Sequence, residues 1–192
     1  MTKGPLIIVS GPSGSGKSTV IARLLEDMAE AALPLHLSVS ATTRRPRPGE
    51  KAGVHYHFWA EEQFDRAVAA GEFLEWATVH GARYGTLRSE VESYREQGSG
   101  VLLEIDVQGA AQIRARYPDS VSIFLRASSL AAYEQRLRRR GTESEEAIRR
   151  RVAAAQRELE NSGKYDHEVI NDDLDKAVAD LSAIVRQQFV KG

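Results

Sequence analysis

A run of eight residues near the N-terminus has the composition of a loop that could hold phosphate groups. It consists of Gly11, Pro12, Ser13, Gly14, Ser15, Gly16, Lys17 and Ser18. A continuous apolar segment, 6–9, precedes the run, and a segment with helical spacing of apolar residues, 18–30, follows it. Glycines let successive backbone N–H groups curl around phosphate oxygens, and the N-terminus of the following helix adds partial positive charge. The strand–loop–helix context is the one in which a phosphate-binding P-loop occurs.

We therefore expect this loop to bind the phosphates of ATP, with Thr19 included in the site. The Lys17 ammonium group would reach the β- and γ-phosphates, and the Ser18 hydroxyl would ligate Mg²⁺. The alternative is a flexible glycine-serine turn, but the flanking strand and helix argue against it. The loop alone does not identify the acceptor, because small-molecule kinases, GTPases and motor ATPases all carry one. The absence of an Asn-Lys-x-Asp motif, which would read guanine in a GTPase, counts against a GTPase.

A second cluster of charge lies in a proline-containing segment, 42–53. Pro46 and Pro48 prevent a regular helix there, so the segment should form a loop. Its cations include Arg44 and Arg47, whose guanidinium forks suit phosphate oxygens. Taken alone, the same composition also fits a solvated basic loop, and we assign that role to Arg45.

Several ordered segments together resemble the guanylate kinase family. They are residues 40–50, 53–58, 73–77, 84–86, 105–109, 140–143 and 169–173. With the P-loop, the resemblance covers almost the whole chain, and several motifs in one order are far more specific than any single motif. The resemblance implies transfer of the γ-phosphoryl group of ATP to GMP, and also to dGMP, with Mg²⁺ as the cofactor bound with ATP.

The resemblance also implies a role for each matching position on the acceptor side. Arg44, Arg47, Tyr56 and Tyr84 would grip the phosphate of GMP, and Ser40, Glu75 and Thr86 would read the guanine. An ionised Glu75 accepts hydrogen bonds only, so it complements the N1–H and amino donors that guanine has and adenine lacks. Position 86 is threonine where the family often has serine, but the hydroxyl group is retained.

Two arginine-rich helices, expected at 129–140 and 143–160, flank Gly141. By resemblance, Arg140 and Arg151 match the arginines that reach the transferring phosphoryl group, so Lys17, Arg44, Arg140 and Arg151 form the expected catalytic set. The other arginines of these helices are interpreted as solvated and paired with nearby glutamates. Asn171 would lie near the adenine, again by resemblance.

Asp106 follows a buried strand, at the end where an α/β fold builds its site. It could hold Mg²⁺ through a water molecule, or it could orient groups of the GMP site. Glu104 points to the same face of the strand, because side chains alternate along a strand. The sequence does not decide between these roles for the two carboxylates.

The alternation of strands and helices predicts an α/β fold, with a P-loop kinase core whose parallel sheet is flanked by helices. The core would comprise about 1–35, 89–126 and 161–192, with a β-rich GMP-binding subdomain at about 36–88 and a helical lid at about 127–160. Within these regions we expect strands at 37–40 and 54–59 and a short helix at 110–115. A further helix is expected to run to Gln97 with Thr86 as its cap.

Composition limits the other possibilities. A formal net charge of −1 over 192 residues argues against general coating of nucleic acid, and the lack of cysteine excludes disulfides and thiolate catalysis. No apolar run reaches the length of a membrane span or signal peptide. We expect a cytoplasmic protein whose partners are the small molecules ATP and GMP, with neither nucleic acid nor membrane.

Three rival interpretations remain. Guanylate-kinase-like domains also occur as inactive binding modules, but these usually have a degraded P-loop, whereas Lys17 and Ser18 are present here. A related kinase acting on a ribose bisphosphate would lack the guanine-reading side chains. A nucleic-acid ATPase fits the short chain and its charge poorly.

Overall fold

The computed structural model describes residues 2–79, 81–139 and 144–190, and its centre is a parallel sheet. The sheet has five strands in the order β2-β7-β1-β8-β9, and every neighbouring pair is parallel. The strands are β1 (Leu6–Ser10), β2 (Leu35–Leu37), β7 (Gly100–Glu104), β8 (Val121–Arg126) and β9 (His167–Ile170). Because the strands are parallel and β1 is central, the loops that follow β1 and its two neighbours all lie at the same edge of the sheet.

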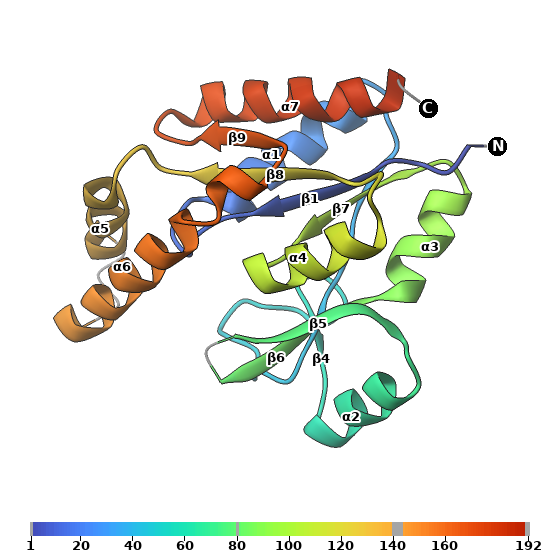
Figure 1. Ribbon diagram of the computed structural model, residues 1–192, viewed down its shortest axis with the longest axis horizontal. Helices are drawn as coiled ribbons and strands as arrows, with labels where there is room; N and C mark the ends of the chain where they lie inside the picture. The colour runs from blue at the N-terminus through green and yellow to red at the C-terminus, as the bar shows by residue number, and fades with distance from the viewer. Residues whose placement is uncertain (1, 80, 140–143, 191–192) are drawn as a thin grey trace.

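Helices cover both faces of this sheet (Figure 1). One face carries α1 (Lys17–Glu30) and α7 (Leu174–Val190), and the other carries α3 (Arg88–Glu96) and α4 (Val107–Arg116). The residues of β1 alternate between the two cores: Ile7 packs with the α1/α7 side and Ile8 with the α3/α4 side. A strand buried on both faces must be apolar throughout, which explains the continuous run 6–9.

A second, smaller sheet lies beyond α4 (Figure 1). Its strands follow the order β4-β3-β6-β5, with β3 parallel to β4 and the other two pairings antiparallel. The strands are β3 (Ala41–Thr42), β4 (His57–Phe58), β5 (Phe73–Val79) and β6 (Ala82–Leu87). Helix α2 (Glu61–Ala69) packs on this sheet through Phe64, which stacks on Phe73 with ring centroids 4.5 Å apart.

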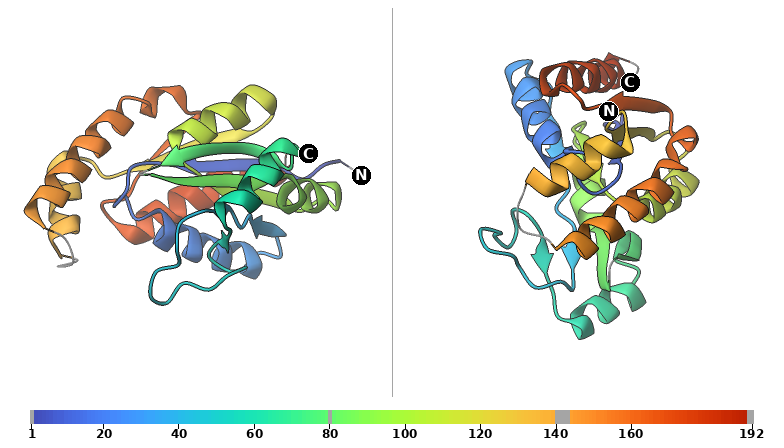
Figure 2. Two further views of the ribbon diagram at one scale, coloured as in Figure 1. Left: turned by 90° about the horizontal axis from the view of Figure 1, so that it is seen from below. Right: turned by 90° about the vertical axis from the view of Figure 1, so that its left-hand side faces the viewer.

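Two helices, α5 (Leu130–Arg139) and α6 (Glu145–Leu159), project from the end of the parallel sheet as a pair (Figures 1 and 2). They share a small core of their own, formed around Tyr133 and Ala155. Ser144 caps α6, since its hydroxyl oxygen accepts a hydrogen bond from the Ala147 N–H at 3.3 Å. A short 3-10 turn, η1 (Ser162–Lys164), leads from the pair to β9.

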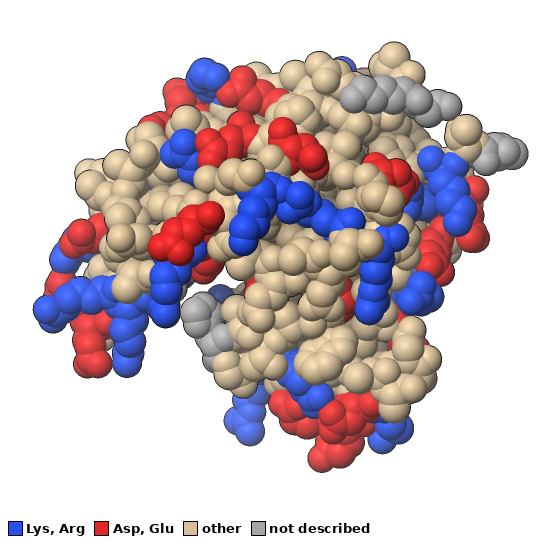
Figure 3. Space-filling view, viewed as in Figure 1, with Lys and Arg blue, Asp and Glu red and all other residues tan. Residues whose placement is uncertain are grey.

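Lysine and arginine side chains are interspersed with aspartate and glutamate over the α5–α6 pair, on the face that Figure 3 shows. Arg138, for example, is paired with Glu134 and Glu145. The helices thus carry mixed charge, as expected for solvated surfaces. Among the described residues, no helix combines the length and apolarity needed to cross a membrane.

The α/β class with a helix-flanked parallel sheet is confirmed, but four local predictions were wrong. The strand expected at 37–40 is divided: β2 ends at Leu37 in the parallel sheet, and β3 begins at Ala41 in the second sheet. Residues 38–40 therefore link one sheet to the other. The strand expected at 54–59 is reduced to His57–Phe58, because Val54 and His55 form a turn whose N–H groups donate to the Lys51 carbonyl.

Thr86 is not a helix cap. It lies in β6, its hydroxyl is used by Glu75, and α3 begins at Arg88 without a side-chain cap. The helix expected at 110–115 begins three residues earlier, at Val107. The reason is that Asp106 caps it, with its carboxylate accepting a hydrogen bond from the Gly109 N–H at 2.8 Å.

Candidate active site

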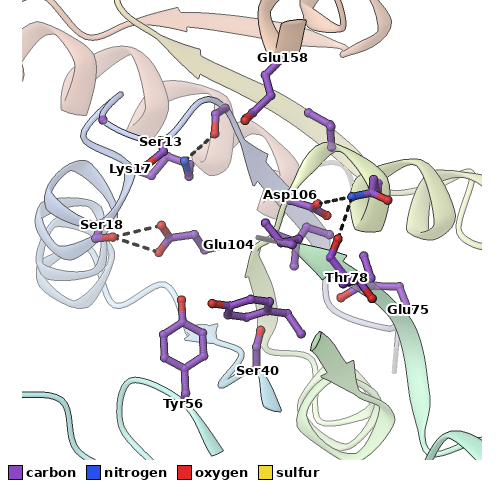
Figure 4. A pocket seen from close by; sticks show the side chains of 18 of the residues that line it. Ser13, Lys17, Ser18, Ser40, Tyr56, Glu75, Thr78, Glu104, Asp106 and Glu158 are labelled. Carbon is purple, nitrogen blue, oxygen red and sulfur yellow. Dashed lines mark hydrogen bonds between the residues drawn. The ribbon is translucent and has the colours of Figure 1, made fainter. Parts of the chain in front are cut away.

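A pocket of about 530 Å³ opens between the P-loop, the carboxyl end of β7 and the second sheet (Figure 4). Its walls come from segments far apart in the sequence, which the two sheets bring together. The predicted site residues that line it are Gly11, Ser13, Gly14, Gly16, Lys17, Ser18, Thr19, Ser40, Arg47, Tyr56, Glu75, Tyr84, Glu104 and Asp106. The residues expected to bind ATP and those expected to bind GMP thus share one cavity.

The shape of the P-loop depends on glycine at two positions in particular. Gly11 and Gly16 have φ values of 148° and 88°, which side-chain-bearing residues rarely adopt. A Cβ atom on Gly16 would lie 2.4 Å from Asn171 Nδ2, and one on Gly11 would lie 2.0 Å from the Leu125 carbonyl oxygen. The loop is therefore pressed against its surroundings, and Asn171 is one of the groups that hold it.

Asn171 and Arg136 both support the loop from behind. The Asn171 side-chain amide donates to the Ser15 carbonyl at 2.7 Å, and Arg136 donates to the same carbonyl at 3.3 Å and to the carbonyl of Asn171. The sequence placed Asn171 near the adenine and left Arg136 as a solvated residue. The second interpretation was wrong, because Arg136 is half-buried against the loop. Its spacing of four residues before Arg140, which would put both arginines on one face of the helix expected at 129–140, was the available signal.

Lys17 lies at the C-terminal end of the P-loop, and its side chain contacts the backbone of that loop. Its ammonium group donates to the carbonyls of Gly11 at 2.6 Å and of Pro12 at 3.2 Å. Burial lowers the pKa of Lys17, while the carboxylates of Glu104 and Glu158, and more weakly Asp106, favour the charged form. Glu158 comes from α6 and lines the pocket on the Lys17 side (Figure 4). The sequence analysis did not identify Glu158, although it lies two helical turns after Arg151.

The Ser18 hydroxyl and Glu104 face each other, with Ser18 Oγ donating to Glu104 Oε1 at 3.1 Å (Figure 4). Asp106 is engaged differently, since its carboxylate accepts from the Gly109 N–H and from the Gln108 side chain at 3.2 Å. Among the described residues, no three or more His, Cys, Asp or Glu side chains are grouped to hold a metal ion. A hydroxyl beside one carboxylate is nevertheless the donor set that suits Mg²⁺, which takes one or two carboxylates and completes its shell with phosphates and water.

Hydrogen bonds hold the Arg44 side chain in place on the side of the pocket where the acceptor is expected. Its two terminal nitrogens bind Glu50 bidentately at 2.9 and 2.8 Å, and its Nε donates to the Tyr84 hydroxyl at 3.2 Å. These hydrogen bonds raise the pKa of Arg44, and the same pair lowers the pKa of Glu50. Arg44 also lies against the Tyr56 ring at 5.4 Å, and burial raises the pKa of the Tyr56 phenol to about 12. Tyr56 is therefore a neutral donor near pH 7.

Glu75 and Thr86 form a buried pair on adjacent strands of the second sheet. The two residues are register partners on β5 and β6, and Thr86 Oγ1 donates to Glu75 Oε1 at 2.6 Å. Glu75 is only 4% exposed, and Thr86 is fully buried. Burial raises the pKa of Glu75 to about 7, with the nearby Asp106 adding to the effect and the Thr86 hydrogen bond opposing it. A carboxylate kept out of water in this way is poised to accept donors from a ligand.

The structure describes one of the two arginines expected to reach the transferring phosphoryl group. Arg151 reaches the P-loop, where its guanidinium donates to the Ser13 hydroxyl. Arg140 lies outside the described residues, so its expected role stays a prediction. The remaining site residues outside the pocket lining are Pro12, Ser15, Arg44, Thr86 and Asn171, each of which contacts a lining residue or supports the loop.

A glycine-rich loop at the end of a helix-flanked parallel sheet, which lines one pocket together with Lys17 and Arg47, defines a P-loop phosphotransferase. The sequence profile of the family described as guanylate kinase matches residues 3–188. The chain belongs to the guanylate kinase family. The guanylate kinase of Symbiobacterium thermophilum is 49% identical, over 95% of this chain and 85% of its own.

Two further relatives agree with this membership. The guanylate kinase of Rubrobacter xylanophilus is 48% identical over all of this chain and 98% of its own. The crystal structure of the Anaplasma phagocytophilum guanylate kinase superposes with a TM-score of 0.78 at 33% identity, covering 98% of this chain and 87% of that one. The likeness therefore extends to the arrangement of the whole chain.

Proposed function

We infer that the protein transfers the γ-phosphoryl group of ATP to GMP, giving ADP and GDP. The observation that carries this inference is the buried Glu75–Thr86 pair, of which Glu75 lines the same cavity as the P-loop. Guanine offers two adjacent donors, N1–H and the amino group, and a carboxylate is the matching acceptor. Adenine presents no such pair, so it would leave the buried carboxylate with the Thr86 hydroxyl as donor and the rest of its acceptor capacity unmet, at a cost of about 1–3 kcal/mol.

The phosphate of GMP would bind between the arginines and tyrosines of the acceptor side. Arg47, Tyr56 and Tyr84 line the pocket there, and Arg44 lies directly behind the two tyrosines. Ser40 lines the same wall and would add a contact to the base. The phosphate oxygen of GMP is itself the nucleophile, so this chemistry needs no general base.

The cationic side chains would offset the charge that accumulates when the two phosphate groups approach. Lys17 and Arg151, which contact the P-loop, would act from the ATP side, joined by Arg140. Arg44 would act from the acceptor side. Phosphoryl transfer depends mainly on in-line placement and such electrostatic stabilisation.

Mg²⁺ would be held by Ser18 with Glu104 beside it, and by Asp106 through water. When bound, the ion supplies positive charge to the phosphates. The hydrogen bond between Ser18 and Glu104 supports this assignment, whereas the carboxylate of Asp106 is already occupied as the cap of α4.

We propose that residues 36–88 act as a GMP-binding subdomain and residues 127–160 as a lid. Closure of both would exclude water, which would otherwise accept the phosphoryl group. The contact between Arg151 on α6 and Ser13 of the P-loop supports a lid that reaches the phosphates.

An acceptor panel tests this function. The protein, ATP and Mg²⁺ are incubated with GMP, dGMP, AMP, CMP, UMP or ribose phosphates, and ADP release is followed. ADP should form with GMP and dGMP at rates far above the others, and Lys17→Ala should abolish it. Preference for a ribose phosphate would indicate the related-kinase alternative, and binding without ADP release would indicate an inactive binding module.

A further inference from the structure

Gly109 occupies a position where glycine has no conformational advantage. It is the third residue of α4, it is buried, and its φ is not among the positive values found elsewhere in the chain. Glycine within a helix costs up to about 1 kcal/mol relative to alanine. The backbone of α4 therefore gives no reason for glycine, and the reason must lie in what surrounds it.

The obstacle to a side chain at this position is the carboxylate of Glu75. A Cβ atom on Gly109 would lie 2.3 Å from Glu75 Oε2 and 2.9 Å from Glu75 Cδ. The next neighbour, Asp106 Oδ1, would be at 3.4 Å, an ordinary contact. Alanine at position 109 and the observed position of Glu75 thus exclude each other, and no other group stands in the way.

Each oxygen of the Glu75 carboxylate has its own neighbour. Oε1 accepts the hydrogen bond of Thr86 at 2.6 Å, while Oε2 occupies the space that a side chain on Gly109 would fill. Figure 4 shows Glu75 and Asp106 on the side of the pocket away from Ser18. Gly109 itself is not among the residues that line the pocket. It can therefore influence the bound base only through the residues that it contacts, and of these Glu75 is the one that a side chain at position 109 would displace.

We propose that Gly109 is a positioning residue for acceptor specificity, which lets the Glu75 carboxylate fit between Thr86 and the first turn of α4. This inference rests on the proposed reading of guanine by Glu75. With a methyl group at position 109, the carboxylate turns away from that place and no longer meets both guanine donors. Because the backbone of α4 accepts alanine, the fold remains intact.

The direct test is Gly109→Ala, with Gly163→Ala as the matched control. Gly163 has ordinary φ and open space where a Cβ would lie, so its substitution should be silent. Gly109→Ala should raise KM for GMP by about 10- to 100-fold, the equivalent of about 1–3 kcal/mol for an unmet buried donor. KM for ATP should stay within about twofold, and the preference for GMP over AMP should shrink.

A double-mutant cycle separates action through Glu75 from a general structural effect. In a Glu75→Ala background the clashing carboxylate is gone, so adding Gly109→Ala should change kcat/KM for GMP by less than about twofold. An equal loss in both backgrounds would overturn the inference. If Gly109→Ala alone fails to fold, the double variant should fold, and its failure to do so would equally overturn it.

The wild-type protein distinguishes a failure of the proposed function from a failure of the proposed role of Gly109. A wild-type protein that does not phosphorylate GMP refutes the proposed function itself. A wild-type protein that does so, together with a Gly109→Ala variant whose KM for GMP matches that of Gly163→Ala, refutes only the role of Gly109.

Discussion

Replacing Glu75 with glutamine should stabilise the nucleotide-free protein at alkaline pH while weakening its use of GMP. Glu75 is buried, and its pKa is raised from the ordinary 4.5 to about 7. A carboxyl group whose pKa is higher in the folded than in the unfolded protein contributes stability while it is protonated in the fold. That contribution is complete below the unfolded pKa and is lost as the pH rises through about 7.

The magnitude follows from the two pKa values. The rise from 4.5 to about 7, at about 1.36 kcal/mol per pKa unit, corresponds to about 3 kcal/mol in total. Most of it, about 2–3 kcal/mol, should be lost between about pH 5 and about pH 8. Glutamine does not titrate, so the variant should lack this part of the pH dependence, while all other titrating groups are shared with the wild type.

The assay is denaturant unfolding of both proteins, without nucleotide, at these two pH values. The wild type should lose about 2–3 kcal/mol more than Glu75→Gln between them. In parallel, the variant should lose about 10- to 100-fold in kcat/KM for GMP, because its amide group presents a donor to a guanine donor. Identical pH dependence of unfolding in the two proteins would refute the claim that the charged form of Glu75 is disfavoured by burial in the nucleotide-free protein.

Three further outcomes are expected. Lys17→Ala should lower kcat by at least about 100-fold in a folded protein, because the lysine stabilises charge that develops during transfer; near-normal kcat would remove it from the catalytic set. Arg136→Ala should raise KM for ATP by about tenfold, because it removes two hydrogen bonds that support the P-loop. Arg138 is exposed and paired with a glutamate on its own helix, so Arg138→Ala should change KM for ATP little. Equal effects of the two substitutions on steady-state kinetics would contradict this role of Arg136. Hydrogen exchange should show GMP alone protecting residues 36–88, and a non-hydrolysable ATP analogue with Mg²⁺ then protecting 127–160, because each region gains charge-assisted hydrogen bonds from its own ligand; equal protection of both by GMP alone would indicate one concerted closure.

The fold was predictable where the residue pattern had a single structural solution. The apolar run 6–9 can be accommodated only in a strand covered on both faces, and the glycines that follow fix the turn into α1. By contrast, β6 was missed. Its segment, 82–87, includes Gly85 and Thr86 and has no clear alternation, and Thr86 before a helical segment has the appearance of a cap. Pairing with β5 overrides that local preference.

The site was predictable in its residue types more than in its contacts. The P-loop was identifiable from its own sequence, but Glu75 and Thr86 were indicated only by the family resemblance, because their pairing depends on the register of two strands. Arg136 and Glu158 were missed for a similar reason: only the way the α5–α6 pair lies against the P-loop shows which of its many charged residues face inward. Sequence composition cannot supply that orientation.

Product analysis tests the central claim most directly. The protein is incubated with GMP, Mg²⁺ and ATP labelled in its γ-phosphoryl group, and the products are separated by chromatography. The account predicts equal amounts of ADP and GDP, with all transferred label in GDP and almost none in inorganic phosphate. Label released as inorganic phosphate without GDP, or ATP left intact in the presence of bound GMP, would contradict it.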